Sequence, residues 1–329
     1  MRNTHMNNLL AAMSAMALGA LFYPGSARAD FPERTVSIVV PFEAGGTVDL
    51  VARALASRLN AKWGVSVIVV NRPGAGNTIG ANAVARAAPD GYTLLLANTS
   101  ISINPSLYKT LPYDTERDLT PVSFLAPSPN VLLVQKSLGV DTLRELIALA
   151  KSRSNSNPLM FASVGKGSFH HFSMEMFKSE AGVELIHVPY KGVASAIVGF
   201  RRGDVDLYCS DLPGALPGIR AGEFKPLAVT GAKRVATLPE VPTMAEAGLP
   251  HYAAAGYVGV MATGGTPPDV LAKLNKDINE VVAEPEFRDQ FSALGYDMVG
   301  STIEEFAAFL KEDIERYKRL VKTIGATAD

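Results

Sequence analysis

Short runs of apolar, β-branched residues alternate with segments whose apolar positions recur every three or four residues. The first pattern is typical of buried strands, and the second is typical of helices with one apolar face. Such alternation predicts an α/β fold with largely parallel sheets, covered by helices on both faces. The expected strands are Val36 to Val40, Val65 to Val70, Thr93 to Ala97, Val131 to Gln135, Leu159 to Ala162, Leu185 to Val188, Val205 to Cys209, Pro226 to Val229 and Tyr257 to Met261.

A threonine followed three residues later by glutamate is typical of a helix start, because the two side chains can cap each other's backbone N–H groups. This pair occurs at Thr142, Thr243 and Thr302. The last pair predicts a long helix that ends near Thr323. Its apolar positions recur at helical spacing and should form one buried face, made of Phe306, Phe309, Leu310, Ile314, Tyr317 and Leu320.

Two loop-rich passages divide the alternating pattern. Pro127 to Asn130 interrupts two apolar runs, and Leu249 to Gly256 is the second passage. If the chain crosses between domains at both places, the first domain is discontinuous. We therefore expect two lobes, one from residues 30–128 plus 252–329 and one from residues 129–251. Two crossings would permit hinge closure over a ligand.

Two glycine-rich junctions lie between an expected strand and an expected helix. The first is Gly45-Gly46, and the second runs from Ser163 to Ser168. Such a junction exposes backbone N–H groups at the positive end of a helix dipole, which suits an anion such as a carboxylate. A single glycine pair is explained as well by a tight turn. Two such junctions, one in each half of the chain, favour a binding site instead.

The N-terminal residues follow a different pattern. Arg2 precedes an apolar stretch from Leu9 to Phe22, and Ala27-Arg28-Ala29 follows it. A charged start, a short apolar core and a small-x-small ending are typical of a secretory signal. We expect residues 1–29 to be a signal peptide that is cleaved after Ala29. The alternative is a retained N-terminal anchor, for which the apolar run is short.

Charge and cysteine content exclude several function classes. The chain has 31 Lys plus Arg and 32 Asp plus Glu, and removal of residues 1–29 leaves 29 against 32. This balance does not favour a nucleic-acid or anionic-membrane surface. The single cysteine, Cys209, excludes a disulfide framework and is expected to be a small buried side chain. His171 and Glu175, four residues apart, are too few ligands for a zinc site, so no metal is expected.

Six motifs in a fixed order link the chain to a known family. They are Pro41-Phe42-x-x-Gly45-Gly46-x-x-Asp49-x-x-Ala52-Arg53, Asn71-Arg72-Pro73-Gly74-Ala75-Gly76, Pro89-Asp90-Gly91-Tyr92-Thr93-Leu94-Leu95, Leu111-Pro112-Tyr113-Asp114, His187-Val188-Pro189-Tyr190-Lys191-Gly192 and Leu238-Pro239-x-Val241-Pro242-Thr243. Through these motifs, nearly the whole chain after residue 29 resembles the periplasmic substrate-binding proteins of tripartite tricarboxylate transporters, the TctC or Bug family. The resemblance implies a type II periplasmic binding fold, with two α/β lobes that close on a small organic anion.

The resemblance also implies a periplasmic location and membrane permease subunits as partners; we expect a monomer with no cofactor. Family members typically hold a ligand carboxylate with backbone amides, hydroxyls and ordered water. The motif positions then predict these ligand-binding residues: Phe42, Gly45, Gly46, Asp49, Thr99, Ser100, Ser163, Gly165, Gly167, Ser168, Tyr190 and Lys191. Four more are expected from their place beside these loops: Glu43, Ala44, His171 and Asp211. The ligand class stays open among di- and tricarboxylates, amino acids and aromatic acids.

Glu43 departs from the family pattern, in which positions 43 and 44 are commonly proline or alanine. A like charge several ångströms from a bound carboxylate would oppose it by roughly 1 to 3 kcal/mol at an effective dielectric near 20. Glu43 therefore either points to solvent or accompanies a ligand with a positive or hydrogen-donating group. Asp211, which follows an expected strand, could face the same site and would favour the second alternative.

Two other function classes are weighed against binding. A secreted hydrolase could use Ser168, His171 and Asp211 as nucleophile, base and orienting acid. The motif Gly-x-Ser-x-Gly is absent, however, and Ser168 is explained more simply as a helix cap. The run from Gly74 to Gly80 invites a dinucleotide-binding interpretation, but its last glycine comes one residue too late for Gly-x-Gly-x-x-Gly. A loop that packs beside the first glycine junction is the preferred interpretation.

Overall fold

The strands expected from the apolar runs form two five-stranded sheets. The computed structural model describes residues 31–153, 157–252, 254 and 256–325, so the expected signal peptide lies outside the described residues. The first sheet has the order β2-β1-β3-β10-β4, and the second has the order β7-β6-β8-β5-β9. The strands are β1 Val36–Val40, β2 Val67–Asn71, β3 Thr93–Asn98, β4 Leu119–Pro127, β5 Asn130–Val134, β6 Leu159–Ser163, β7 Leu185–Pro189, β8 Leu207–Asp211, β9 Lys225–Val229 and β10 Tyr257–Thr263.

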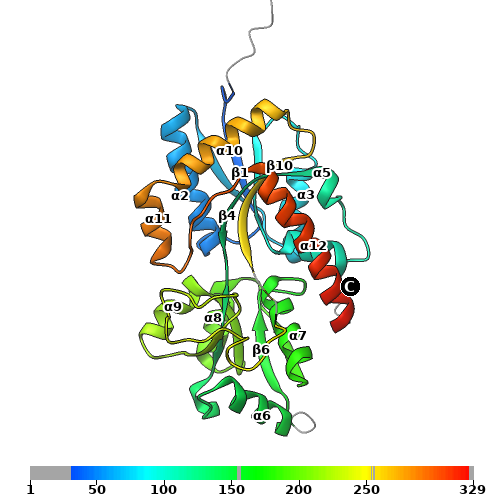
Figure 1. Cartoon of the computed structure of the whole chain (residues 1–329), viewed down its shortest axis with the longest axis vertical. Helices are drawn as coiled ribbons and strands as arrows, with labels where there is room; N and C mark the ends of the chain where they lie inside the picture. Colours follow the sequence, from blue (N-terminus) through cyan, green and yellow to red (C-terminus); the bar gives the residue numbers. More distant parts are fainter. Residues whose placement is uncertain (1–30, 154–156, 253, 255, 326–329) are drawn as a thin grey trace, which may run out of the picture. The chain divides into compact units, whose positions relative to one another are not determined.

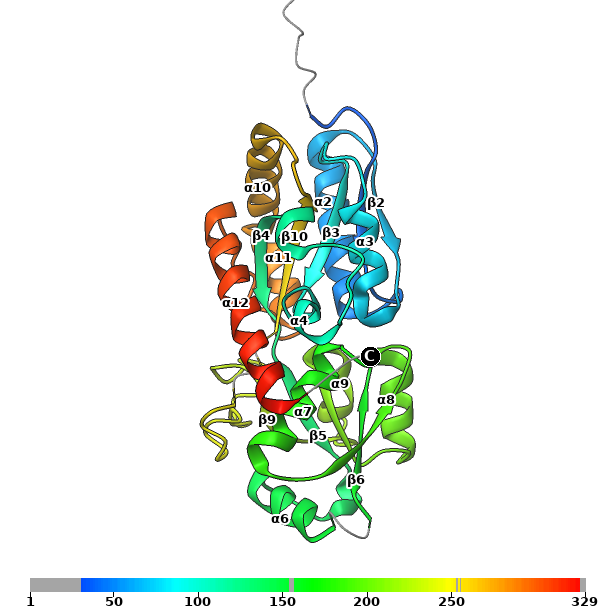
Figure 2. The ribbon, with the colours of Figure 1, turned by 90° about the vertical axis from the view of Figure 1, so that its right-hand side faces the viewer.

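Helices flank both sheets, as the alternating pattern predicts. Figures 1 and 2 show α2, α3, α10 and α12 beside the first sheet, and α6, α7, α8 and α9 beside the second. The helices are α2 Thr47–Trp63, α3 Thr78–Ala85, α4 Ser100–Leu107, α5 Thr115–Asp118, α6 Leu143–Arg153, α7 Phe169–Ala181, α8 Val193–Arg202, α9 Leu212–Arg220, α10 Pro268–Val282, α11 Pro285–Ser292 and α12 Ile303–Ile324, with short 3-10 turns η1 Ala75–Asn77 and η2 Lys136–Leu138. The mixed α/β class is confirmed.

Strand direction differs from the expectation of largely parallel sheets. The pairs β1–β2, β1–β3, β6–β7 and β6–β8 are parallel. The pairs that involve β10 and β5 are all antiparallel. A crossover helix forces parallel pairing of the strands that it joins. Strands β5 and β10 instead enter their sheets from the other sheet, so no such crossover sets their direction.

Strand β4 is absent from the strands expected from sequence. It lies at the edge of the first sheet and contains Pro121 and Pro127, and its register with β10 shifts twice. Proline is tolerated in edge strands because an edge leaves N–H positions unpaired, but it interrupts the apolar alternation that marks a strand. The pair Thr243 and Glu246 forms the expected capping box, yet it caps a turn and not a helix.

The last helix, α12, packs against elements of both sheets. Thr302 and Glu305 form the predicted capping box at its start. Phe306 and Leu310 lie in the core with β10, whereas Tyr317 meets Phe172 of α7 edge to face, with ring centroids 4.9 Å apart. Figure 2 shows α12 running along β4 toward α7. Four residues of the predicted apolar face are therefore buried and two, Phe309 and Leu320, are partly buried, against two different partners.

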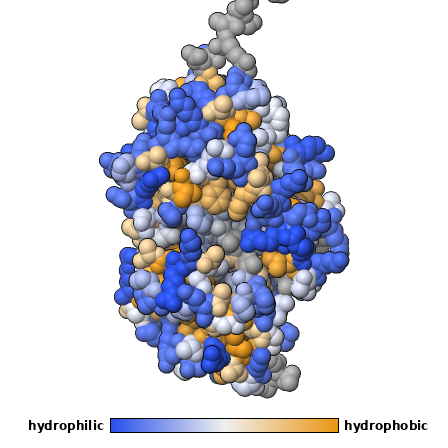
Figure 3. Space-filling model, in the orientation of Figure 1, coloured by the Kyte–Doolittle hydropathy of each residue, from blue (hydrophilic) through white to orange (hydrophobic). Residues whose placement is uncertain are grey.

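One face of the molecule shows how polar and apolar residues are distributed on the surface (Figure 3). Figure 3 shows hydrophilic residues over much of one face, interspersed with smaller hydrophobic areas. Scattered exposed apolar side chains, such as Leu50, Ile68 and Ile186, are ordinary on protein surfaces. Among the described helices, none has the length and apolar character needed to cross a bilayer.

Candidate ligand-binding site

The first glycine junction connects β1 to α2. Gly45 has a φ of +89°, which side-chain-bearing residues rarely adopt, and Gly46 is the N-cap of α2 without any side-chain cap. A Cβ added at Gly46 would meet nothing nearer than the Glu43 carbonyl oxygen, at 3.9 Å. The N-terminus of α2 therefore keeps uncapped N–H groups and open space beside them.

Asp49 holds this junction together. Its carboxylate accepts hydrogen bonds from the Gly45 N–H at 2.9 Å, from the Arg53 guanidinium at 2.8 and 3.1 Å, and from the Asn71 amide at 2.8 Å. Asn71 also donates to the carbonyl of half-buried Phe42, at 3.1 Å. Burial alone would raise the pKa of Asp49, but the bonds from Arg53, Gly45 and Asn71 outweigh burial and lower it. The Asp49 carboxylate, predicted to contact the ligand, is thus already bonded to neighbouring protein groups.

The second junction connects β6 to α7, and it also relies on left-handed glycines. Gly165 and Gly167 have φ values of +115° and +76°. The Ser168 hydroxyl donates to the Gly165 carbonyl at 2.7 Å and accepts from the His171 N–H at 3.2 Å, as an N-cap of α7. Ser163 is fully buried, and its hydroxyl accepts from the Gly165 N–H at 3.1 Å. Both serines therefore shape the loop that they belong to.

Segment 76–80 touches both junctions. A Cβ at Gly80 would lie 2.8 Å from the Pro41 Cβ, beside the first junction. A Cβ at Gly76 would lie 3.2 Å from the Lys166 carbonyl oxygen and 2.5 Å from the Tyr108 hydroxyl. The glycines of this segment thus permit close approach of backbone, as expected for a packing loop. Tyr108 was not among the residues predicted for the site. The glycines that pack against its hydroxyl, Gly76 and Gly167, are the sequence feature that could have indicated it.

A buried hydrogen bond joins elements of the two sheets. The Thr47 hydroxyl, in the first turn of α2, donates to Asp211 Oδ2 at 2.8 Å. Asp211 is the N-cap of α9, is 9% exposed, and its Oδ1 has no hydrogen-bond partner. A Cβ at Gly214, in the first turn of α9, would lie 3.2 Å from Oδ1. The N-termini of α2 and α9 are therefore adjacent, with one buried carboxylate between them.

Removal of this bond provides a stability prediction. Replacement of Thr47 by valine, which has the same shape, is expected to lower the free energy of unfolding by about 1–3 kcal/mol, because Asp211 then lacks its hydroxyl donor. Chemical denaturation of the purified protein measures the change. The same substitution at exposed Thr110 is the control and should change stability by less than about 0.5 kcal/mol. Equal effects at both positions would contradict the assignment.

Glu43 is exposed to solvent, which is one of the two alternatives expected from the sequence. Its carboxylate nevertheless lies close to Gly192. A Cβ added at Gly192 would lie 2.8 Å from Glu43 Oε2. Gly192 is the N-cap of α8, and the Ser195 hydroxyl bonds its backbone. The carboxylate of Glu43 therefore lies at a third helix N-terminus, where a negative charge is stabilised.

The other predicted residues are spread over this region. Thr99 and Ser100 are buried, where Thr99 accepts from the Tyr257 N–H at 2.9 Å and Ser100 accepts from the Asn77 amide at 3.0 Å. The Tyr190 ring lies along α8 against Gly199, whereas Lys191 is exposed. Ala44 is exposed beside Gly45. Contacts thus join the 42–49 junction to Asp211 and Gly192, and segment 76–80 lies against residues of both glycine junctions, whereas the Tyr190 ring is directed along α8.

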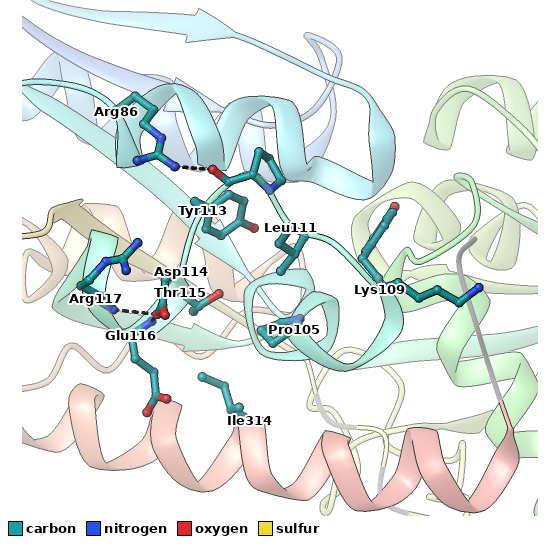
Figure 4. A pocket seen from close by; sticks show the side chains of 12 residues that line it. Arg86, Pro105, Lys109, Leu111, Tyr113, Asp114, Thr115, Glu116, Arg117 and Ile314 are labelled. Carbon is teal, nitrogen blue, oxygen red and sulfur yellow. Dashed lines mark hydrogen bonds between the residues drawn. The ribbon is translucent and has the colours of Figure 1, made fainter.

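Two cavities of about 470 and 390 Å³ lie elsewhere. The larger is shown in Figure 4 and includes Arg86, whose guanidinium donates to the Pro112 carbonyl. Tyr108 lines this cavity while its hydroxyl lies near Gly167. The smaller cavity is lined by residues of the β5–α6 and α9–β9 regions. Neither cavity is lined by a predicted ligand-binding residue.

The geometry does not assemble a hydrolase triad. The Ser168 hydroxyl donates to a backbone carbonyl, and the His171 ring accepts from the Gly167 N–H at 3.3 Å. Asp211 is bonded to Thr47 and not to an imidazole. In the part of the chain that the structure describes, the Ser168 hydroxyl is bonded to the His171 backbone N–H, and no hydrogen bond joins it to the His171 imidazole. Nor do the described residues include three His, Cys, Asp or Glu side chains grouped as a metal site.

Cys209 lies on β8, fully buried and unpaired, as expected from its apolar context. Burial raises the pKa of the Cys209 thiol to about 12. A thiol in this environment is not a nucleophile at neutral pH. This residue contributes to packing and not to a reactive site.

Comparison with known proteins supplies the family. The model of the tripartite tricarboxylate transporter family receptor matches residues 51–326. BugT of Bordetella pertussis is 36% identical, and the match covers 98% of this chain and 99% of BugT. Rpa4515 of R. palustris, solved with adipate, is 37% identical with a TM-score of 0.85, over 91% of this chain and 99% of that one. The periplasmic binding protein BugD is 35% identical with a TM-score of 0.84, over 90% and 99% of the two chains.

These matches extend over nearly the full length of each relative, and the shared fold includes both sheets. The family assigned from the six motifs is therefore confirmed by three kinds of similarity. The chain belongs to the receptor family of the tripartite tricarboxylate transporters.

Proposed function

We propose that this chain is a periplasmic receptor that captures a small organic carboxylate and delivers it to a tripartite tricarboxylate-type membrane transporter. The ligand would lie between two lobes, made of residues 30–128 plus 252–329 and of residues 129–251. The observation that carries the proposal is the buried hydrogen bond between Thr47 and Asp211. It joins the N-terminus of α2, which flanks the first sheet, to that of α9, which flanks the second. Asp211 already offsets the α9 dipole, whereas the N-terminus of α2 has no side-chain cap and attracts an anion, so a carboxylate is the ligand that this arrangement favours.

The chemistry of the two junctions supports capture without an arginine clamp. Gly46 leaves the start of α2 uncapped, and the Arg53 guanidinium at the first junction is engaged by Asp49. Micromolar affinity requires about 8 kcal/mol net, which several backbone hydrogen bonds and modest apolar burial can supply. Closure around the ligand would remove water and strengthen each remaining polar contact.

A relative supports a small carboxylate as the ligand. Rpa4515, at 37% identity, is described with adipate, an aliphatic dicarboxylate. We propose a small carboxylate of the same general kind for this chain, without choosing among dicarboxylates, tricarboxylates, amino acids and aromatic acids. We also propose that residues 1–29 are removed after Ala29, that the exported protein is a monomer, and that it binds without turnover.

A ligand screen with a matched pair of variants tests this function. Calorimetry and thermal shift should detect saturable binding of at least one of adipate, malate, aspartate, citrate or benzoate, and proton NMR should detect no product. Gly46→Val should weaken that binding at least about tenfold, because its methyl groups occupy the space beside the N–H groups of α2. Gly46→Ala should have a smaller effect. Product formation, or full affinity in Gly46→Val, would contradict the proposal.

A further inference from the structure

Two histidines and a phenylalanine stack directly beneath the 163–168 junction. The rings of His171, on α7, and His187, on β7, have centroids 4.2 Å apart and an interplanar angle of 25°. The ring of Phe161, on β6, stacks on His187 with a centroid distance of 4.9 Å. The side chain of His171 is 10% exposed. Three neighbouring elements therefore place two imidazoles in contact, below the predicted carboxylate-binding loop.

Each imidazole directs a ring nitrogen to a residue of the junction. His171 Nδ1 accepts the Gly167 N–H at 3.3 Å, so its ring proton lies on Nε2, which faces Glu175 at 3.8 Å. His187 Nε2 lies 2.6 Å from the Ser163 hydroxyl, which already accepts the Gly165 N–H. The Ser163 hydroxyl has two acceptors within reach, His187 Nε2 and the Gly165 carbonyl oxygen at 3.2 Å, and we infer that its proton is directed to the nearer one, His187 Nε2. In that arrangement both rings accept a hydrogen bond through an unprotonated nitrogen, as neutral imidazoles do.

The charged groups around the pair oppose protonation. Lys166 precedes α7, and Lys178 lies on α7, where it pairs with Glu175 at 3.0 Å. Burial, followed by Lys178 and Lys166, lowers the pKa of His171 to about 4. Burial, followed by the neighbouring His171 ring, lowers the pKa of His187 to about 4, against the opposite effect of Glu175. A proton on either ring would convert an acceptor into a donor and place a charge within the stack.

We propose that His171 and His187 are positioning residues that hold the 163–168 junction in its ligand-receiving shape as a neutral stacked pair, so that protonation of the pair releases the loop and its carboxylate. The sequence-based expectation placed His171 at the ligand itself and did not include His187. The inference deepens the proposed function and rests on it, because the loop is the one assigned to the carboxylate. It makes capture sensitive to acid through the chain's own imidazoles.

Nitrogen-15 NMR of the wild-type protein tests the pair without any ligand. At pH 7 both rings should be neutral, with the proton on Nε2 in His171 and on Nδ1 in His187, and the Gly167 amide should exchange slowly with solvent. Because both folded-state pKa values lie below the ordinary 6.5, thermal stability should fall as the pH decreases from about 6.5 to 4. The Gly167 amide should lose protection over the same range as the rings titrate. Protonated rings at pH 7, or rings that titrate without any change at Gly167, would overturn the proposal.

Variants of His171 separate the hydrogen bond from packing. In His171→Asn the amide oxygen replaces Nδ1 as an acceptor that cannot titrate, whereas His171→Phe keeps the stacked ring and has no acceptor. At pH 7, the Gly167 amide should exchange with solvent about tenfold faster in His171→Phe than in the wild type. In His171→Asn its exchange rate should stay within about threefold of the wild-type rate. His251→Gln, at an exposed position, is the control. Equal exchange rates in the asparagine and phenylalanine variants would show that the ring acts through packing alone.

Adipate is the probe that tests whether the histidine pair affects ligand affinity. His171→Phe should bind it about tenfold more weakly at pH 7 than His171→Asn. Between pH 7 and 4, wild-type affinity should fall about twofold more than that of His171→Asn, a comparison that cancels the protonation of adipate itself. If wild type binds no carboxylate of the screen at pH 7, the proposed function fails, while the NMR result still decides the role of the pair. Parallel pH profiles in wild type and His171→Asn would refute acid release.

Discussion

Replacement of Asp49 by asparagine is expected to lower the free energy of unfolding by about 3 kcal/mol. The carboxylate is 1% exposed and accepts bonds from Gly45, Arg53 and Asn71. An asparagine amide has one acceptor oxygen, so its NH2 group would face a donor and the Arg53 charge would lose its partner. Because Gly45 also loses its anchor, affinity for any carboxylate ligand should fall together with stability. Urea denaturation and calorimetry measure the two effects.

A matched control for Asp49 is Asp90→Asn. Asp90 also pairs with an arginine, Arg34, at 2.8 Å, but the two side chains are 38% and 63% exposed. Exposed ion pairs contribute little, so this variant should lose at most about 1 kcal/mol. The same loss in both variants would show that burial and the multiple donors at Asp49 do not matter.

The loss of stability in Asp49→Asn should also depend on pH. The folded-state pKa of Asp49 lies below its ordinary 3.8, so the ionised carboxylate contributes stability above that pH. This contribution is lost as the pH falls from 3.8 through the lower folded-state value. The difference between wild type and Asp49→Asn should therefore be constant at neutral pH and shrink below about pH 3.8. A difference that grows in acid would contradict the assignment.

Replacement of Gly80 by alanine is the second substitution with a large expected effect, at about 3 kcal/mol of unfolding free energy. The new Cβ would lie 2.8 Å from Pro41 Cβ, 2.9 Å from Pro41 Cα and 3.0 Å from the Arg72 carbonyl oxygen. All three atoms belong to backbone or to a proline ring and cannot rotate away. Helix α3 must shift, and it would displace the start of the first glycine junction. Thermal denaturation and ligand affinity should therefore both respond.

Gly46→Ala is the control for steric specificity. Gly46 has a φ of −78°, and its nearest neighbour, the Glu43 carbonyl oxygen, is 3.9 Å from the added Cβ. This substitution should change stability by no more than about 0.5 kcal/mol. If Gly80→Ala is as mild as Gly46→Ala, then α3 does not support the first junction in the way that the structure indicates.

The position of Glu43 bears on ligand selectivity. Its carboxylate lies near the N-cap of α8, and Asp211 is the N-cap of α9. Both acids therefore lie at helix N-termini, where their charges are partly offset by the helix dipoles. This placement reduces the repulsion that an isolated acid would exert on a bound carboxylate. The sequence alone left open whether Glu43 faces solvent or the ligand, and the exposed position beside Gly192 does not require an amine-bearing ligand.

Local patterns predicted much of the fold because local interactions set them. Val36–Val40 is a strand at the expected boundaries, and the helix after Thr302 carries the predicted capping box. An apolar run and an adjacent cap are readable without knowledge of distant residues. Strand β4 and the direction of β5 and β10 could not be predicted in this way, because pairing with strands far along the chain determines them.

The predicted site shows a similar division. The motifs indicated which junctions carry glycines, and Gly45, Gly165 and Gly167 do adopt positive φ values. The motifs did not indicate which side chains are already engaged. Asp49 bonds its own loop and Thr99 bonds Tyr257, so their roles as direct ligand contacts stay predictions. Side-chain direction depends on partners brought in by folding.

The sequence by itself determined the α/β class, the receptor family and the two glycine junctions, because strand runs, helix caps and motif order are local properties of the chain. Only the tertiary structure decided that Thr47 meets Asp211, that Gly80 supports Pro41, and that His171 and His187 stack beneath the second junction. Those contacts join residues far apart in sequence. Their existence depends on the packing of whole helices and sheets, which no single segment specifies.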